Sequence, residues 1–82
     1  MRKDTVDRVE RYAERYFQRS GCTEFPTMRQ VARGLRLRIR DVSDAVDDSE
    51  NLMRTYWNVE GGWERVPLGD FFVETLNPPA EA

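Results

Sequence analysis

Apolar residues recur with a helical period along the first twenty positions of the chain. One stripe is formed by Val6, Val9, Ala13, Tyr16 and Phe17, with Tyr12 on its flank. The pattern predicts a helix that runs to about Arg19, with Asp4 or Thr5 as its N-terminal cap. Gly21 follows in the position that glycine favours just beyond a helix.

Two shorter apolar patterns follow within residues 26–46. The first comprises Met28, Val31, Ala32 and Leu35, and the second comprises Ile39, Val42, Ala45 and Val46. Because so few residues separate them, the sequence predicts two helices that meet at an angle, with Leu37 filling the turn. Thr27 and Gln30 have the spacing of a capping box at the start of the first of these helices.

Val31-Ala32-Arg33, followed by Leu35, Leu37 and Val42, resembles the spacing of the helix-turn-helix of bacterial transcriptional regulators. In that family a small residue stands where the two helices touch, and Ala32 matches it. The family usually has glycine at the opening of the turn and Ser or Thr as the cap of the second helix. This chain has Arg36 and Arg38 there instead, with Gly34 two positions early. The resemblance implies that the second helix occupies a DNA major groove. An ordinary helical hairpin in a small core is the alternative.

The character of the sequence changes after Asp48. Leu52–Val59 is rich in Thr, Tyr, Trp and Val and predicts a strand, and a turn at Glu60-Gly61-Gly62 leads to a return strand over Trp63–Val66. Trp57 and Trp63 would then pair across the hairpin. For the last element, residues 71–76, Asp70 as a cap favours a short helix, whereas alternating apolar positions favour a strand. We expect the helix.

A hairpin directly after a helix-turn-helix resembles the winged helix domain. The sequence therefore predicts an α+β fold, a small winged helix-turn-helix with three helices, a C-terminal β-hairpin wing and a short last element. Residues 1–76 would form this domain, and residues 77–82 a flexible tail.

The composition limits the size of the domain and the cellular compartment that we expect for it. The 82 residues suffice for one small domain. They contain no apolar run near the length of a membrane span and no signal-peptide pattern, so we expect a cytoplasmic protein without membrane contact. Cys22 is the single cysteine, which excludes an internal disulfide and fits a reducing compartment.

Charge is distributed unevenly although the net charge is only −2. Residues 1–40 contain 11 basic and 5 acidic side chains, whereas residues 41–82 contain 2 basic and 10 acidic ones. Twelve of the 13 basic residues are arginine, which favours bidentate contacts to phosphate or carboxylate. This asymmetry fits a polyanion-binding face opposite an acidic face, and it equally fits self-association through complementary patches.

Catalysis has little support. The chain has no histidine, and its single cysteine cannot form a thiolate–imidazole pair or a structural zinc site. The carboxylates of residues 44–50 lack the spacing and the glycine of a calcium loop. Gly61-Gly62 is not followed by the lysine of a phosphate-binding loop. We therefore expect no enzyme activity, no metal and no cofactor.

Candidate DNA contacts lie along the helix-turn-helix. They are Arg29, Arg33, Arg36, Arg38, Arg40, Ser43 and Asp44. Arg38 and Arg40 stand at the front of the second helix, where arginine reads guanine. Ser43 and Asp44 would follow on its outward face, although Asp44 could pair with Arg40 instead. Arg29, Arg33 and Arg36 share a face of the first helix of the helix-turn-helix, which is the helix that crosses the phosphate backbone in this family.

Carboxylates on the second helix argue against DNA, because they repel phosphate. They are Asp41, Asp44, Asp47 and Asp48. The leading hypothesis is nevertheless a sequence-specific regulator of transcription that binds duplex DNA. The alternative is a winged helix that binds another protein through its acidic second half and has no DNA affinity of its own.

We expect a homodimer. The candidate interface combines aromatic residues of the first helix with apolar residues of the last element, namely Tyr12, Tyr16, Phe71, Phe72 and Leu76. The competing interpretation is that Phe71 or Phe72 closes the core of the monomer beneath the hairpin.

Overall fold

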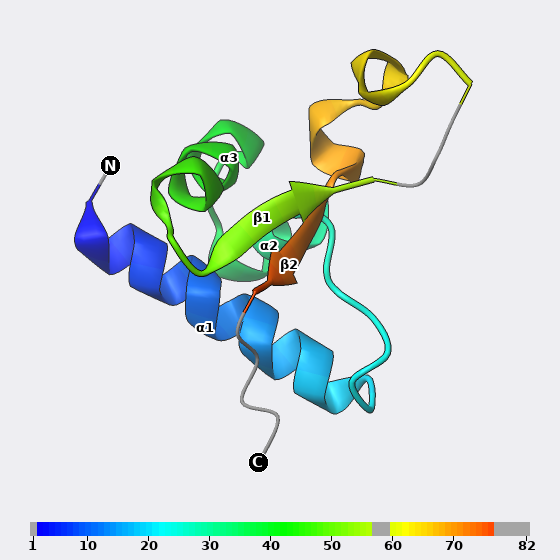
Figure 1. Cartoon of the computed structure of the whole chain (residues 1–82). Coiled ribbons are helices and arrows are strands. Elements are labelled where there is room, and N and C mark those ends of the chain that lie inside the picture. Colours follow the sequence, from blue (N-terminus) through cyan, green and yellow to red (C-terminus); the bar gives the residue numbers. More distant parts are fainter. Residues whose placement is uncertain (1, 57–59, 77–82) are drawn as a thin grey trace.

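Three helices precede a two-stranded antiparallel sheet, as predicted, in a computed structural model that describes residues 2–56 and 60–76 (Figure 1). The helices are α1 (Lys3–Arg19), α2 (Met28–Leu35) and α3 (Ile39–Asp48). The strands are β1 (Leu52–Thr55) and β2 (Phe72–Thr75), and the short 3-10 helices η1 (Trp63–Arg65) and η2 (Leu68–Asp70) lie between them. None of the helices described is long and apolar enough to cross a membrane.

The hydrophobic core lies where the three helices meet the inner face of the sheet. Its buried members are Val9, Ala13, Met28, Val31, Ala32, Val42, Ala45, Val46, Leu52, Phe71 and Val73. The helices supply most of the apolar positions that their periodicity predicts, although Tyr16 and Phe17 of α1 are not part of this core, and each strand supplies one residue, Leu52 from β1 and Val73 from β2. The start of α1 differs from the prediction, because Arg2 is its N-terminal cap residue and Asp4 already lies in its first turn.

Strand β2 occupies the centre of a small three-segment arrangement. Its residues pair with β1 in the register Leu52↔Thr75 to Thr55↔Phe72. On its other side Phe72 forms an isolated antiparallel bridge with Thr27. The backbone N–H of Val73 donates to the carbonyl of Pro26 at 2.8 Å. The segment between α1 and α2 is therefore fastened to the last strand of the domain.

The predicted return strand over Trp63–Val66 is wrong. These residues form the one-turn helix η1, in which Arg65 N–H donates to Gly62 O and Val66 N–H donates to Trp63 O. Backbone groups used inside this turn cannot also form a ladder with β1. The predicted pairing of Trp57 with Trp63 fails with it, since Trp63 is not in a strand. Residues 57–59 lie outside the described part.

The helix expected for residues 71–76 is also wrong, because they contain strand β2. Its burial alternates along the strand, with Val73 and Thr75 buried and Phe72 and Glu74 half-buried. Asp70 does not cap a following helix; its carboxylate instead forms an ion pair with Arg29. The predicted tail, residues 77–82, lies outside the described residues.

Candidate nucleic-acid interface

Helices α2 and α3 pack against each other as the helix-turn-helix prediction requires. Ala32 of α2 and Val42 of α3 are both buried in the shared core. Leu37 lies in the turn, half-buried and packed against the core.

Arg36 closes α2 in the left-handed region, with φ 58° and ψ 43°. The N–H groups of Arg36 and Leu37 both donate to the carbonyl of Ala32, the second at 2.8 Å. Glycine is usual at such a helix end because a β-carbon is unfavourable in this conformation. Arg36 adopts the geometry of that glycine position while keeping its side chain exposed.

Gly34 serves a different purpose from the turn glycine of the family. A β-carbon built on it would lie 2.5 Å from Cε2 of Tyr12. The tyrosine ring of α1 therefore lies directly on the backbone of α2. This contact explains why the glycine stands two positions before the turn.

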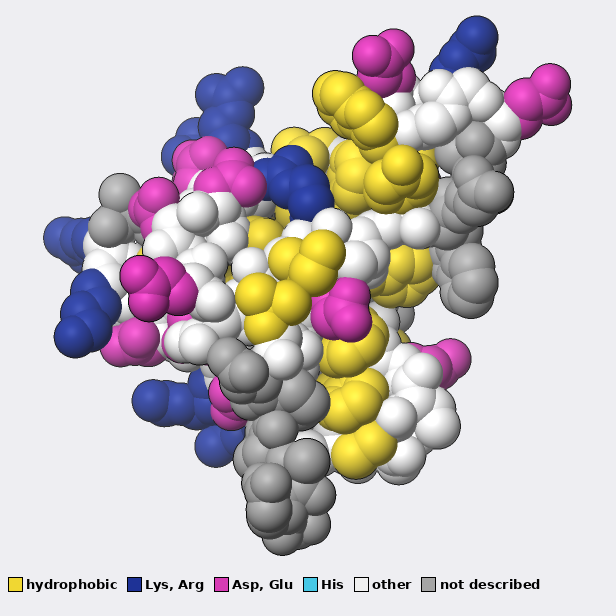
Figure 2. Space-filling view, in the orientation of Figure 1, with side chains coloured by type: hydrophobic (Ala, Val, Ile, Leu, Met, Phe, Trp, Pro, Cys, Tyr) yellow, Lys and Arg dark blue, Asp and Glu magenta, His cyan; other side chains and the backbone are white. Residues whose placement is uncertain are grey.

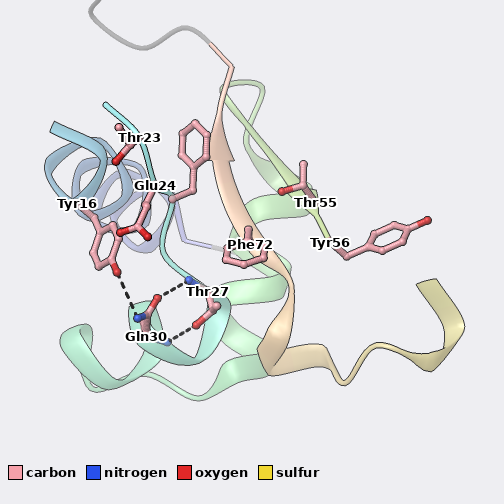
Figure 3. Close-up of a pocket in the computed structure, with 9 residues that line it drawn as sticks. Tyr16, Thr23, Glu24, Thr27, Gln30, Thr55, Tyr56 and Phe72 are labelled. Carbon is pink, nitrogen blue, oxygen red and sulfur yellow. Dashed lines mark hydrogen bonds between the residues drawn. The ribbon is translucent and has the colours of Figure 1, made fainter. Parts of the chain in front are cut away.

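The start of α2 is fastened to α1 through the predicted capping box (Figure 3). The Thr27 hydroxyl accepts from Gln30 N–H at 3.1 Å, and Gln30 Oε1 accepts from Thr27 N–H at 2.8 Å. Gln30 Nε2 then donates to the Tyr16 hydroxyl at 3.3 Å. These groups border a groove of about 460 Å³ between the hairpin and the end of α1. Because their polar atoms hold helices together, we assign them a structural role.

Arg38 stands at the N-terminus of α3 with its guanidinium turned onto its own helix. Nε and NH2 donate to the Asp41 carboxylate at 3.2 and 3.3 Å. These hydrogen bonds hold the pKa of Asp41 below its usual value and raise the pKa of Arg38. The Arg38 side chain is 81% exposed, so it remains accessible to solvent. A guanine or phosphate would have to compete with Asp41 for it.

Ser43 does not lie on the outward face of α3, so that part of the prediction is wrong. It is buried, and its hydroxyl accepts a hydrogen bond from Arg54 NH2 at 3.0 Å. The same guanidinium group is paired with the Asp47 carboxylate. Arg54 of β1 thus joins the sheet to α3 and neutralises one of the aspartates that would repel DNA.

Arg29 is likewise engaged within the domain. Its guanidinium is paired with Asp70 of η2, and both side chains remain about half exposed. A β-carbon on the buried Gly69 would lie 2.8 Å from Arg29 NH2, so the guanidinium lies against that glycine. The side chain of Arg29, which the sequence predicts to contact phosphate, therefore also links α2 to η2.

Besides Arg29 and Arg38, four predicted contact residues are exposed, namely Arg33, Arg36, Arg40 and Asp44. Within the described residues none of the three arginines has a carboxylate within salt-bridge distance, and Asp44 does not pair with Arg40. The free cations of the helix-turn-helix thus come from the end of α2, the turn and the first turn of α3.

Two of the residues expected at a dimer interface belong to the monomer. Phe71 is 5% exposed and lies in the core, as the competing interpretation stated. Tyr12 is half-buried against Gly34. Tyr16 and Phe72 are half-buried, while Leu76 is exposed.

Arg54 and Asp70 bind candidate contact residues, Ser43 and Arg29 respectively, and sequence reasoning missed both contacts. Arg54 sits two positions after Leu52 in β1 and so shares its inward face, which was a readable signal. Asp70 carried no comparable signal, because its partner is 41 positions away. Within the described residues, no group of three or more His, Cys, Asp and Glu side chains is placed to hold a metal ion. Comparison with known protein families, with curated proteins and with solved structures found no match for this chain.

Proposed function

We propose that this chain is a regulator of transcription that binds duplex DNA through α2 and α3, as in a winged helix domain. One observation carries the proposal. Helices α2 and α3 pack against each other and present three exposed arginines, Arg33, Arg36 and Arg40, and no carboxylate of the described residues lies within salt-bridge distance of them. Phosphate neutralisation dominates DNA affinity, and a helix of this kind fits a major groove.

The roles divide along the two helices. Arg40 and Arg38, in and before the first turn of α3, are the candidates for reading base edges, and Arg38 must leave Asp41 to do so. Arg33 and Arg36 contact phosphates on either side of the groove. Asp44 accepts from a cytosine amino group. The buried Ser43 is left out of this set.

Salt-dependent titration of labelled duplex DNA tests the proposal. Arg33→Ala and Arg36→Ala should weaken binding to every sequence and lower the salt slope by about one unit each. Arg40→Ala should cost about 1–3 kcal/mol on a specific site. Arg11→Ala is the matched control, because it removes an exposed arginine from α1. Equal losses in all four variants, or no binding at low salt, would contradict the proposal.

The proposed regulator acts as a homodimer, with two α3 helices placed about one DNA turn apart. Leu76, Phe72 and Tyr16 are the exposed or half-buried members of the predicted interface. Leu76→Glu should dissociate the dimer without unfolding it. Sedimentation equilibrium decides the matter, since a single species of 9.7 kDa at micromolar concentration would exclude the dimer.

A second function, protein binding without DNA affinity, is favoured by one specific observation. The segment between the strands exposes Trp63 and Leu68 beside carboxylates, which is unfavourable next to phosphate. The DNA titration separates the two functions, because only the first predicts binding that falls steeply with salt.

A further inference from the structure

The segment between β1 and β2 exposes several large apolar side chains to solvent. We call its described residues, 60–71, the wing. Trp63 is 60% exposed and Leu68 is 40% exposed, as is Tyr56 at the end of the preceding strand region. Together with Arg54, Glu64 and Phe71 they line a groove of about 470 Å³. Figure 2 shows hydrophobic side chains gathered over this part of the molecule, with both acidic and basic side chains beside them.

Internal contacts hold the walls of this groove in place. The Tyr56 ring meets the Phe71 ring edge-on, with centroids 5.9 Å apart and planes at 80°. The Arg54 guanidinium lies 5.8 Å from the centroid of Phe71. It is itself held by Ser43 and Asp47 of α3. A partner would therefore meet one wall of the groove, formed by Arg54, Tyr56 and Phe71, that is already held in place, which lowers the entropic cost of binding.

Helix α2 fixes the far side of the groove. Asp70, at the end of η2, is paired with Arg29. Because the Arg29 guanidinium also lies against Gly69, the one-turn helix that carries Leu68 is attached at two adjacent positions. Side chains of this kind, Trp, Tyr and Arg around a hollow, dominate the energetics of protein interfaces.

The wing has more carboxylates than cations, while the groove itself is lined by one of each, Glu64 and Arg54. The wing contains three carboxylates, Glu60, Glu64 and Asp70, and one cation, Arg65. Asp70 is neutralised by Arg29, whereas no ion pair of Glu60 or Glu64 occurs within the described residues. Glu64 lines the groove directly. A ligand bound there gains if it carries positive charge beside its apolar part, and a phosphate backbone is repelled.

We propose that the wing groove binds a protein segment that inserts an aliphatic or aromatic side chain between Trp63 and Leu68 and places Lys or Arg beside Glu64. This surface does not depend on the DNA-binding proposal. The arginines of α2 and α3 are not part of it, so the two can fail separately.

Three synthetic peptides of equal length test the proposal on the full chain. One alternates leucine and lysine in an amphipathic pattern, the second replaces every leucine with serine, and the third replaces every lysine with glutamate. Binding is measured by anisotropy of the labelled peptide. In parallel, the indole N–H signal of Trp63 is followed by NMR, with Trp57→Phe used to assign it. We expect the leucine–lysine peptide to bind at least about tenfold more tightly than the other two and to shift the Trp63 signal.

Matched variants locate the site. Trp63→Ala should weaken binding about tenfold or more, as expected for an exposed anchor at the centre of an interface. Glu64→Gln should weaken it less and reduce its salt dependence. Met53→Ser is the control, because Met53 is 43% exposed but lies on β1 and not in the groove.

Several results would overturn the proposal. One is equal binding of the leucine and serine peptides, which would mean charge attraction alone. Another is an unmoved Trp63 signal, which does not depend on the folding of any variant. Equal losses in Trp63→Ala and Met53→Ser, or no binding of any peptide, would do the same.

Discussion

The helix-turn-helix and the wing are built by different kinds of interaction. Between residues 28 and 48, α2 and α3 are held by buried aliphatic side chains and by backbone groups satisfied at the turn. In the wing, Arg29 of α2 pairs with Asp70, Arg54 of β1 lies over the Phe71 ring, and large apolar side chains remain exposed. The buried contacts that stabilise the domain therefore lie in the first region, while exposed apolar surface is concentrated in the second.

The comparison shows that part of the wing is held in a defined position although its large apolar side chains are exposed. The ion pair of Arg29 with Asp70 attaches η2 to α2, yet such an exposed pair contributes only about 0–1 kcal/mol to stability. We expect changes at buried positions of the helix-turn-helix to alter global unfolding, and changes at exposed positions of the wing to leave it almost unchanged.

The largest contrast is expected between two substitutions by aspartate. Val42→Asp places an unpaired carboxylate in the core and should destabilise the domain by at least about 4 kcal/mol, enough to unfold it. Leu68→Asp, at an exposed wing position, should change the free energy of unfolding by no more than about 1 kcal/mol. Circular dichroism during thermal unfolding measures both. A Val42→Asp protein that melts cooperatively would contradict the register assigned to α3.

Gly34→Ala should reveal the contact between α1 and α2. Its β-carbon would collide with the Tyr12 ring, at a cost of about 1–3 kcal/mol that exceeds the roughly 1 kcal/mol gained in helix propensity. In a Tyr12→Ala background the collision is absent, so the same substitution should become stabilising. Urea unfolding of the four proteins forms the complete cycle. The same sign in both backgrounds would exclude the close approach of Tyr12.

Arg36→Gly should stabilise the domain by about 1 kcal/mol, because glycine adopts the left-handed conformation without the penalty of a β-carbon. Arg33→Gly is the matched control, since it makes the same chemical change inside α2 and should cost about 1 kcal/mol. Opposite signs in urea unfolding are the expected result. If both variants are less stable, the Arg36 side chain contributes more stabilising free energy than its left-handed backbone conformation costs.

The smallest effect expected is the pH dependence of the Arg38–Asp41 pair. Because the pKa of Asp41 is lowered in the folded protein, its contribution is complete above the pKa of the unfolded chain. It is lost as the pH falls through the lowered pKa of the folded state. The stability difference between the native protein and Asp41→Asn should therefore shrink as the solution is acidified. A difference that stays constant from neutral to strongly acidic pH would rule out the pair.

The same comparison explains which features the sequence could predict. The helices follow from periodic apolar positions such as Val31 and Val42, because local spacing determines which side chains share a face. The capping box at Thr27 is local as well. The path of the wing cannot be predicted from local spacing. Residues 63–66 include strand-forming types, but the backbone N–H groups of Arg65 and Val66 form hydrogen bonds within the turn of η1 and not with β1.

The site was predictable to a similar degree. The exposed arginines of α2 and the turn were recognised because they lie opposite the apolar stripe. The engagement of Arg29 by Asp70 and of Ser43 by Arg54 depends on contacts between distant segments. The groove beside Trp63 also depends on a contact between distant segments, because Phe71, which directly precedes β2, must meet the Tyr56 ring to form one of its walls.

Strand β2 has a consequence for the order in which the molecule forms. It lies between β1 and the Pro26–Thr27 segment, and Thr27 meets a residue 45 positions later in the chain. Contacts of such high sequence separation form slowly, whereas those of a helical hairpin form early. During folding, α2 and α3 can therefore associate before Val73 docks beside them. We expect the arginine surface to form first on a chain whose core is still open, and the wing groove to appear only when the last strand docks.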